Sequence, residues 1–543
     1  MREGPTSIGD DVTELRDASA AGGAAHRSEL SPLSFLARSE FVYPDKVAVV
    51  HEDRRYTYRQ FGERVRRLAS ALRNAGLENG DRVAVIAPNI PALLDAHYGV
   101  PAAGGVLVAI NYRLNAVDVS FILEHSGARF VFVDHEFEDL VQDAAADRIV
   151  RIDDTGEPDD PYEAFLGEGS PDAALTLPDD EDQAISINYT SGTTGRPKGA
   201  IYHHRGAYLN ALGEVIETRL TPESVYLWTL PMFHCNGWCF TWAVTAVGGR
   251  HVCLRKVDAG RIWQLIDAEA VTHYNGAPTV QSSLLDHDQA HKLDREVITT
   301  VSGSPPSAEL IGRLKEVGIR PIHVYGATEL FGPYMICEPQ PGWDELPIKE
   351  HAQHLARQGV HYVVAEPVRV VDDQGDEVVA DGKTLGEVLM RGNNVMTGYF
   401  DEPEQTEEAL AGGWYHSGDL AVRHSDGYIE IRDRKKDIIV SGGENISTIE
   451  VEQALLKHPA VAEVAVVSMP DEKWGERPKA FVELTEGEDA SADDILSFAK
   501  ERLSGYMRPA AVEIVELPKT STGKVQKKEL RDKEWEGHDR SVG

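Results

Sequence analysis

Cysteine is scarce in this sequence, whose 543 residues include 4 cysteines: Cys235, Cys239, Cys253 and Cys337. They form no CxxC pair and no regular spacing, so a disulfide framework is excluded and a reducing, cytoplasmic location is expected. His234 lies beside Cys235, but metal ligands so close together in sequence rarely complete a tetrahedral zinc site. We therefore expect an intracellular protein without structural zinc.

Basic residues are also fewer than acidic ones. The sequence has 54 Lys and Arg and 89 Asp and Glu, which gives a formal net charge of −35. This sign repels phosphodiester backbones and anionic lipids, which argues against nucleic acid as a partner. Long apolar runs are missing as well, because the most apolar stretch, Val100 to Ile110, is too short for a membrane span. The first residues lack a basic segment followed by an apolar run, so we expect neither a secretion signal nor an integral membrane segment.

What is present is ordinary for a folded protein, with 42% hydrophobic and 26% charged residues. The length predicts more than one domain. Residues 1–30, rich in Ala, Gly, Ser and Asp, are predicted to be a disordered tail.

From Tyr43 onward, strand-like and helix-like segments alternate. VAVVHE, YRQFGERVRRLASALRNAGL and DRVAVIAP predict a strand, a helix and a strand, and the scheme recurs between Gly206 and Tyr325. Near-continuous Val and Ile runs in the strands are typical of parallel sheets with helices on both faces. The fold class is therefore α/β, with a large N-terminal domain of stacked, helix-covered β-sheets.

After Glu366 the sequence becomes β-rich, with short strands between Gly and Asp turns, which predicts a small β-barrel-like subdomain. The charged segment DRKKD, Asp433 to Asp437, then marks a break. Beyond it, two helices and three strands predict a small, mobile α+β domain. We expect an N-terminal domain at 31–433 and a C-terminal lid domain at 434–543.

The segment YTSGTTGRPKG, Tyr189 to Gly199, is the most informative for chemistry. It follows a strand-like stretch and places three glycines, four Ser or Thr hydroxyls and a lysine in eleven positions. Such a loop can direct backbone N–H groups, hydroxyls and an ammonium group toward phosphate oxygens. It is not a Walker loop, because Gly199, not Ser or Thr, follows Lys198.

Four further segments accompany this loop. YGATE (325–329) offers an aromatic ring, a hydroxyl and a carboxylate, and YHSGDL (415–420) places a carboxylate in a turn that can bind a ribose. DRKKDIIVSGGENIS (433–447) joins a basic hinge to a glycine pair, and PKTSTGK (518–524) holds a lysine in a loop. In this order the five motifs resemble the adenylate-forming superfamily of acyl-CoA synthetases, luciferases and peptide-synthetase adenylation domains, from about Pro32 to Lys528.

The resemblance implies two half-reactions: a carboxylate attacks the α-phosphorus of ATP to form an acyl-adenylate and pyrophosphate, and a thiol, usually of CoA, then displaces AMP. It implies ATP, Mg²⁺ and coenzyme A, with Thr190, Glu329 and Lys524 as catalytic residues. Thr190 and Glu329 would hold Mg²⁺, and Thr328 would contact the α-phosphate. The β- and γ-phosphates would be cradled by Thr190, Ser191, Gly192, Thr193, Thr194, Gly195 and Lys198.

The resemblance also assigns the nucleoside. Gly303, Ser304 and Tyr325 would bound the adenine, and Gly326 would be a further nucleotide-binding residue. Asp419 and Arg434 would bind the ribose, and Lys524 would bridge the attacking carboxylate and the α-phosphate. For the second step the small domain would rotate about a hinge at Lys436, and Gly442 and Gly443 would border the CoA channel, since glycine admits a thin thiol chain.

The acyl pocket is predicted around the segment FHCNGW, which looks like that of bacterial and plant enzymes activating medium-chain, branched or aryl acids. Its residues would be His234, Asn236, Gly237, Trp238 and Pro278. The stretch from Met232 to Phe240 has no Arg or Lys to pair a second carboxylate, which favours a monocarboxylic acid. A role of Trp238 as an ordinary core aromatic stays open.

Three readings of function stay open: an AMP-forming acyl-CoA ligase; an adenylating enzyme with another acceptor, such as a carrier-protein thiol, an amine or an inorganic nucleophile; and a non-catalytic binding protein. The first is favoured by the glycine pair and the hinge. Two departures from relatives weaken any transfer of substrate choice: Leu330–Phe331 after YGATE, and Thr448–Ile449 where Ser-Pro or Ala-Pro is commoner. The sequence leaves open the acid and whether the chain forms a homodimer.

Overall fold

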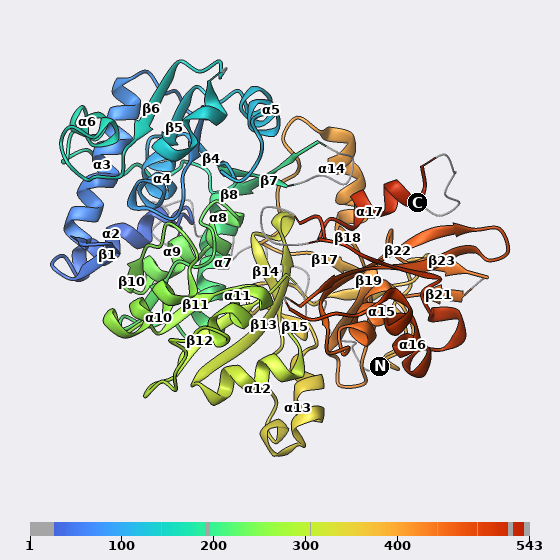
Figure 1. Cartoon of the computed structure of the whole chain (residues 1–543). Helices are drawn as coiled ribbons and strands as arrows, with labels where there is room; N and C mark the ends of the chain where they lie inside the picture. Colours follow the sequence, from blue (N-terminus) through green and yellow to red (C-terminus); the bar gives the residue numbers. More distant parts are fainter. Residues whose placement is uncertain are drawn as a thin grey trace, which may run out of the picture.

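The computed structural model describes residues 27–142, 144–190, 196–303, 306–442, 444–485, 487–519 and 525–536. Residues 1–26, most of the predicted tail, therefore lie outside the described residues. Within the described ranges, the strands form four sheets (Figure 1). None of the described helices combines the length and the hydropathy needed to cross a membrane.

The first sheet has the strand order β6-β5-β3-β4-β7-β8 and is parallel except for the antiparallel pair β7 and β8. Its strands are β3 (Arg82–Ile86), β4 (Val106–Ala109), β5 (Phe130–Asp134), β6 (Arg148–Ile152), β7 (Ala184–Thr190) and β8 (Lys198–His203). The helical elements of this part of the chain are α3 (Tyr58–Asn74), α4 (Pro91–Ala102), α5 (Ala116–Ser126), η2 (His135–Val141) and α6 (Pro161–Gly167).

Both faces of this sheet are buried, as the Val and Ile runs predict. Along β3, Val83 and Val85 belong to one core cluster, and Ala84 and Ile86 belong to another. Successive side chains of a strand point to opposite faces, so two separate clusters mean that each face has its own cover.

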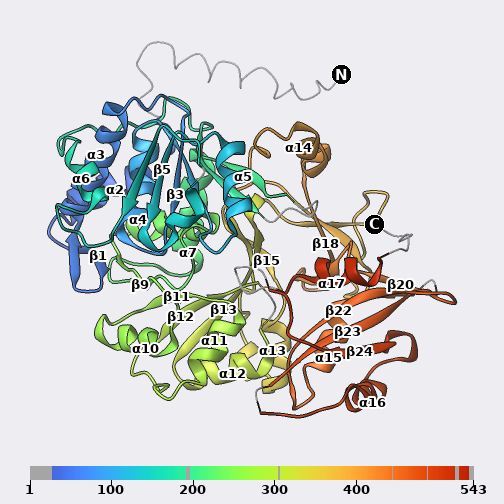
Figure 2. The same ribbon diagram turned by 45° about the horizontal axis from the view of Figure 1, so that its top comes forward.

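The second sheet has the strand order β15-β14-β13-β12-β11-β9-β10-β1-β2. Its strands are β1 (Val47–His51), β2 (Arg54–Thr57), β9 (Val225–Leu227), β10 (Arg250–Val252), β11 (His273–Asn275), β12 (Val297–Val301), β13 (Ile319–Ala327), β14 (Gly332–Ile336) and β15 (Val360–His361). The helical elements are α2 (Leu33–Val42), α7 (His204–Glu217), α8 (Cys235–Trp238), α9 (Phe240–Ala246), α10 (Ala259–Ala268), α11 (Pro278–Leu285), α12 (Ala308–Glu316), η3 (Thr328–Leu330), η4 (Trp343–Glu345) and α13 (Ile348–Leu355). Figure 2 shows α10, α11 and α12 along this sheet.

The β-rich part after Glu366 is an antiparallel sheet of order β16-β17-β18-β19. It consists of β16 (Arg369–Val371), β17 (Gly386–Met390), β18 (Tyr415–Arg423) and β19 (Ile429–Arg434), accompanied by α14 (Pro403–Ala409) and η5 (Ala411–Gly413). Strand β19 ends at Arg434, two residues before Lys436, so this sheet leads directly into the predicted hinge.

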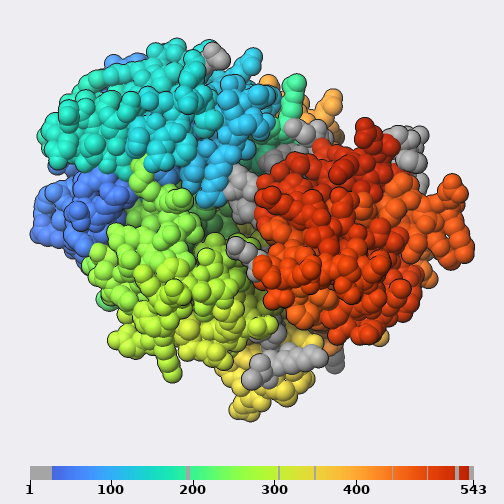
Figure 3. Space-filling model, in the orientation of Figure 1, coloured from blue at the N-terminus to red at the C-terminus, as the bar shows by residue number. Residues whose placement is uncertain are grey.

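The C-terminal residues form an α+β unit, which Figure 3 shows in red and orange as a lobe beside the green and yellow surface. Its elements are β20 (Ile439–Ser441), β21 (Glu444–Ile446), α15 (Thr448–Leu455), β22 (Val461–Asp471), β23 (Gly475–Leu484), α16 (Ala492–Arg502), η6 (Gly505–Met507), β24 (Ala511–Ile514) and α17 (Lys527–Glu534). The helices and strands predicted beyond the break are present here, together with β20, β21 and α17, which were not predicted. The domain boundary at 433/434 stays a prediction.

Candidate active site

Two adjacent strand ends flank the predicted phosphate loop. Thr190, the last residue of β7, lies opposite Lys198, the first residue of β8, in antiparallel register. Both are half-buried. The loop residues Ser191 to Gly195 lie outside the described residues. The predicted hydroxyl and ammonium groups are therefore neighbours at one edge of the first sheet.

The carboxylate of Glu329 lies in the same region. Tyr399 donates a hydrogen bond to Glu329 Oε1 at 2.7 Å, and the Lys198 Nζ lies 5.1 Å from the centre of the Tyr399 ring. The turn η3, which contains Glu329, packs against both β7 and β8. Lys198, Glu329 and the end of β7 therefore converge, although the YGATE motif is distant from them in sequence.

Tyr399 is a site residue that sequence reasoning missed. Burial, and after it the charge of Glu329, raises the pKa of Tyr399, so its hydroxyl stays protonated and can donate. This donation fixes one oxygen of the Glu329 carboxylate. Tyr399 lies in the segment TGYFDE, outside the five motif segments, so the motif argument did not identify it.

The donor set at this edge fits a magnesium ion. A hydroxyl from Thr190 and a carboxylate from Glu329 are hard oxygen ligands, and Mg²⁺ is typically bound through one or two carboxylates together with substrate phosphates. The oriented Glu329 carboxylate and the nearby Lys198 also supply opposite charges for a metal–phosphate group.

The predicted nucleoside residues are brought together by β13 and β18. The Tyr325 hydroxyl donates to Asp419 Oδ2 at 2.5 Å, and Asp419 faces Arg434 across β18 and β19, with Arg434 Nε 3.6 Å from Oδ1. Ser417 Oγ accepts a hydrogen bond from the Asp419 N–H. Burial, followed by the Asp419 carboxylate, raises the pKa of Tyr325, which keeps it a donor.

Two glycines shape the backbone near this nucleoside region. A Cβ on Gly326 would lie 1.8 Å from the Gly332 carbonyl oxygen, so the contact between β13 and β14 requires glycine. Gly303 follows β12 with a φ of +98° and open space around it. Because Val301 of β12 pairs with His323 of β13 in parallel, Gly303 follows β12 at the end where Tyr325 lies in β13. Ser304 lies outside the described residues.

Thr328 connects this region to the predicted acyl pocket. Its hydroxyl accepts a hydrogen bond from Cys235 Sγ at 3.5 Å, and its carbonyl accepts one from the Tyr202 hydroxyl at 2.6 Å. Burial raises the pKa of Cys235 to about 12, so this thiol is neutral and is no nucleophile.

The acyl segment forms a left-handed turn, because every residue from Cys235 to Cys239 has a φ between +50° and +63°. Asn236 is fully buried and accepts hydrogen bonds from Ser186 Oγ at 2.7 Å and Asn188 Nδ2 at 2.8 Å. A Cβ on Gly237 would lie 2.4 Å from the Trp228 ring. Both residues therefore have packing roles, and their predicted contact with an acyl group stays a prediction.

The other predicted acyl residues surround this turn. Trp238 is 8% exposed, and a Cβ on Gly332 would lie 3.1 Å from it. His234 is half-buried directly before the turn, and Pro278 begins α11. This burial is compatible with both hypotheses for Trp238: an ordinary core aromatic or a residue that lines the acyl pocket.

The predicted hinge and CoA-channel residues lie after β19. Lys436 is half-buried, and its pKa is lowered by burial and then by Arg434. Gly442 has a φ of +60°, and a Cβ there would meet the Trp474 ring at 2.6 Å, so glycine is required for packing. Gly443 and Lys524 lie outside the described residues.

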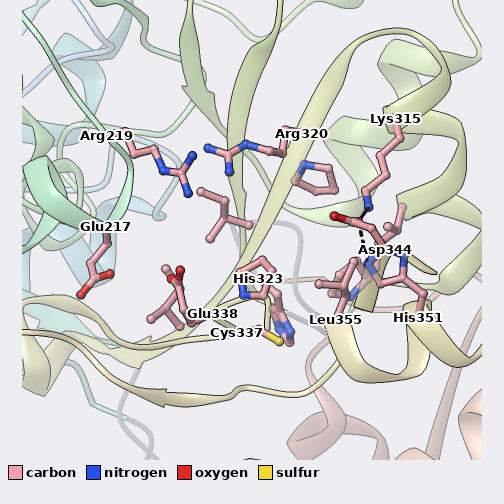
Figure 4. Close-up of a pocket in the computed structure, with 16 residues that line it drawn as sticks. Glu217, Arg219, Lys315, Arg320, His323, Cys337, Glu338, Asp344, His351 and Leu355 are labelled. Atoms are coloured by element: carbon pink, nitrogen blue, oxygen red, sulfur yellow. Dashed lines mark ion pairs between the residues drawn. The ribbon is translucent and has the colours of Figure 1, made fainter. Parts of the chain in front are cut away.

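A cavity of about 240 Å³ lies elsewhere, and none of the predicted site residues within the described ranges lines it. In Figure 4 the guanidinium groups of Arg219 and Arg320 point toward one another across it, with Glu217 and Glu338 on the opposite wall. The predicted catalytic chemistry therefore belongs to the strand edges described above.

Comparison with known proteins agrees with these motifs. The family model for AMP-binding enzymes matches residues 36–400, and that for the AMP-binding enzyme C-terminal domain matches residues 450–524. The chain is 44% identical over 541 residues to the peroxisomal acetate/butyrate–CoA ligase of Arabidopsis thaliana, covering 94% of this chain and 95% of that protein. It is 45% identical over 523 residues to a 4-hydroxybutyrate–CoA ligase of Metallosphaera sedula, covering 93% and 94%.

Solved structures show the same fold. The ATP-bound MatB of Rhodopseudomonas palustris has a TM-score of 0.82 at 26% identity, over 92% of this chain and 98% of that chain. The o-succinylbenzoate CoA synthetase of Bacillus subtilis, solved with ATP and magnesium, has a TM-score of 0.79 at 26% identity, over 91% and 98%. The resemblance predicted from five motifs and the α/β fold class are thus confirmed, and the chain belongs to the family of AMP-binding, adenylate-forming enzymes.

Proposed function

We infer that this protein is an ATP-dependent acyl-CoA ligase, which activates a carboxylic acid as an acyl-adenylate and transfers the acyl group to CoA with release of AMP and pyrophosphate. The observation that carries this function is the convergence of Lys198, Glu329 and the end of β7 at one strand edge. The relatives named as CoA ligases support the same activity.

In the first half-reaction we propose that the acid oxygen forms a bond to the α-phosphorus of ATP while the bond to the pyrophosphate oxygen breaks. Two anions must approach each other, so positioning and charge neutralisation supply most of the catalysis. Thr190 and Glu329 would hold Mg²⁺, which when bound neutralises phosphate charge. Lys198 would bind the outer phosphates, and Lys524 would bridge the acid and the α-phosphate.

The nucleoside of ATP would be oriented by the second group of residues. Asp419 would accept hydrogen bonds from the ribose hydroxyls, and its carboxylate is already positioned by the Tyr325 hydroxyl. Arg434 would approach the ribose from the neighbouring strand. Tyr325, Gly303 and Ser304 would bound the adenine, and Gly326 would be a further nucleotide-binding residue.

In the second half-reaction we propose that the CoA sulfur bonds to the acyl carbon, and the bond from that carbon to the AMP oxygen breaks. The thiol proton leaves with solvent, and AMP departs as the stable anion. Rotation about Lys436 would withdraw Lys524 and bring Gly442 and Gly443 to the thiol channel.

For the acid, we propose an apolar monocarboxylic acid of the medium-chain, branched or aryl class. The acyl segment contains no Arg or Lys that could pair a second carboxylate. Relatives are named for acetate or butyrate, for 2-methylpropanoate and for trans-cinnamate, all of them monocarboxylates. Those names add short acids to the class that should be tested.

The test is a screen of pyrophosphate release over short, medium, branched and aryl acids, with and without CoA. We expect release that depends on acid, ATP and Mg²⁺, with one acyl-CoA and one AMP formed per pyrophosphate when CoA is present. Turnover that is unchanged by CoA, with the acyl group appearing on an amine or a carrier-protein thiol, would contradict the CoA assignment. No release with any acid would contradict adenylation itself.

The alternative with an acceptor other than CoA is not favoured, because the relatives are named as CoA ligases. A cytoplasmic location stays a proposal, since several relatives are named as peroxisomal. Homodimer formation likewise stays a proposal, to be tested by light scattering of the purified chain.

A further inference from the structure

Two hydrogen bonds cross the predicted hinge to the buried carboxylate of Asp433. Asp433 lies in β19, before Lys436, and is 1% exposed. Its Oδ2 accepts hydrogen bonds from the hydroxyl of Thr448, at 2.8 Å, and from the Thr448 N–H. Thr448 begins α15, beyond the hinge, so a residue of the last strand before the hinge holds the start of a helix after it.

The Thr448 hydroxyl also connects Asp433 to the last described helix of the chain. It accepts a hydrogen bond from Lys527 Nζ at 2.8 Å, and Lys527 in turn pairs with Glu452 of α15 at 2.7 Å. Lys527 is the first residue of α17 and follows the proposed catalytic residue Lys524 by three positions in the sequence. One hydroxyl thus joins the strand before the hinge to the helix that follows the catalytic loop.

Helix α17 also contacts the chain directly after Lys436. Arg531, one turn beyond Lys527, forms an ion pair with Asp437, and both side chains are largely buried. Residues four positions apart lie on one face of a helix, so Lys527 and Arg531 face the hinge segment together. Asp433 and Asp437, the two acidic residues that flank Lys436, are therefore both connected to α17.

A buried carboxylate is costly unless it is hydrogen-bonded, so the contacts of Asp433 favour the arrangement in which they form. Rotation about Lys436 would move Thr448 relative to Asp433 and break these directional bonds. We propose that Asp433 and Thr448 form a latch across the hinge, which stabilises this arrangement of the two bodies and opens when the C-terminal domain rotates. The proposal rests on the proposed function, because it assumes two half-reactions that need different arrangements.

Asp433 and Thr448 would then be positioning residues, which act by setting the balance between the two arrangements. The latch assigns a role to Thr448, which together with Ile449 replaces the commoner Ser-Pro or Ala-Pro pair. An alanine at position 448 has no hydroxyl and cannot make both bonds to Asp433, whereas a serine can.

The first test is Thr448→Val, which removes the hydroxyl and keeps the shape of the side chain. Adenylate formation from ATP and acid, and thioester formation from supplied acyl-adenylate and CoA, are measured separately in single turnovers. We expect the ratio of the two rates to change by about tenfold, the effect of one hydrogen bond to a charged group. Thr448→Ser should restore the ratio, since serine keeps the hydroxyl.

The matched control is Asp494→Asn. Asp494 is paired with Ser491 in the capping box of α16, so the bonds it loses lie within the C-terminal unit and do not cross the hinge. This variant should leave the ratio of the half-reactions unchanged. Equal loss of both half-reactions in Thr448→Val, with the ratio of the wild type, would mean that Thr448 is only structural and would overturn the latch.

A second measurement does not depend on activity. Spin labels on Glu124→Cys and Asp489→Cys, both exposed positions, report the distance between the two bodies, and the native cysteines are buried. Thr448→Val should shift the distance distribution toward a second population, and an unchanged distribution would overturn the latch. The proposed function is tested separately. If it is wrong, the wild type will release no pyrophosphate in response to a carboxylic acid, whereas the distance measurement can still be made and still tests the latch.

Discussion

The hydroxyl of Tyr325 donates a hydrogen bond to Asp419 Oδ2 across 2.5 Å, although 94 positions separate the two residues in sequence. Tyr325 belongs to β13 of the second sheet, and Asp419 belongs to β18 of the antiparallel sheet. The bond joins two of the five motifs and orients the carboxylate that we assign to the ribose. It therefore links the architecture of the chain to nucleotide binding.

Replacing Asp419 with asparagine should weaken ATP use. The amide keeps the shape but loses the charge that accepts from two hydroxyls, and hydrogen bonds to a charged group contribute about 1.5–3 kcal/mol each. We expect kcat/KM for ATP to fall about 100-fold, with a much smaller change in the KM for the acid. Steady-state kinetics with each substrate varied would check this.

The matched variant is Tyr325→Phe, which keeps the ring for adenine and removes the bond to Asp419. It should cause a smaller loss than Asp419→Asn. If neither variant alters the KM for ATP, the assignment of this pair to the nucleoside is wrong.

Lys524→Ala should separate the two half-reactions. The ammonium group is proposed to bridge two anions during adenylation, whereas it has no role once pyrophosphate has left. We expect adenylate formation from ATP to fall by about two to three orders of magnitude, comparable to loss of a major electrostatic contact. Thioester formation from supplied acyl-adenylate should stay near the wild-type rate, and equal loss of both in single-turnover assays would refute this role.

Lys436→Pro should impair mainly the second half-reaction. Proline fixes φ and restricts the residue before it, so rotation at this position becomes difficult. Pyrophosphate release in a single turnover should persist, while acyl-CoA formation slows. Normal thioester turnover by this variant would show that the hinge lies elsewhere.

Gly237→Ala should destabilise the acyl segment. The new Cβ would lie 2.4 Å from the buried Trp228 ring, at a φ of +62° that disfavours alanine. Overpacking of this kind typically costs about 1–3 kcal/mol. We expect a lower thermal unfolding midpoint, with Gly412→Ala as the control, since Gly412 also has a positive φ but has open space around it. Equal midpoints for both variants would contradict the steric explanation.

Stability should fall as the pH drops from about 6.5 toward 4. Burial lowers the pKa of five histidines to about 3 or 4: His97, His204, His251, His273 and His323. Because their folded pKa values lie below the ordinary value of 6.5, the unfolded chain binds more protons in this range. The stabilisation is thus complete above about pH 6.5 and is lost as the pH falls.

The measurement is the urea unfolding midpoint at a series of pH values through this window. His323→Gln should reduce the loss, because the amide can still donate to the Arg357 carbonyl that His323 contacts but does not titrate. The comparison with His323→Gln isolates the histidine, because burial raises the pKa of Asp95 to about 6 and that of Glu452 to about 7, and these carboxyl groups change stability in the opposite sense. A difference between wild type and His323→Gln that does not vary with pH would contradict neutral burial of His323.

Much of the fold and many of the site positions could be predicted from local sequence. The Val and Ile run of β3 indicated a strand buried on both faces, and the two core clusters agree. The motif segments also marked Thr190, Lys198, Glu329, Tyr325 and Asp419, which the structure brings together at two neighbouring regions.

Other features gave no local signal. Tyr399 contacts Glu329 from 70 positions away, and Thr448 contacts Asp433 across the hinge. The left-handed turn from Cys235 to Cys239 contains a single glycine, so its conformation depends on the buried bonds of Asn236 to Ser186 and Asn188. These partners lie far away along the chain, and nothing near each residue identifies them.

The sequence by itself determined the order of strands and helices, the glycine positions and the identity of the charged groups, because these depend on neighbouring residues and on residue chemistry. Only the tertiary structure decided that the Tyr399 hydroxyl orients Glu329 and that the Tyr325 hydroxyl orients Asp419. It also decided that Thr448 bonds to Asp433 across the hinge. These contacts depend on sheet order and on the packing of elements that are distant in the chain.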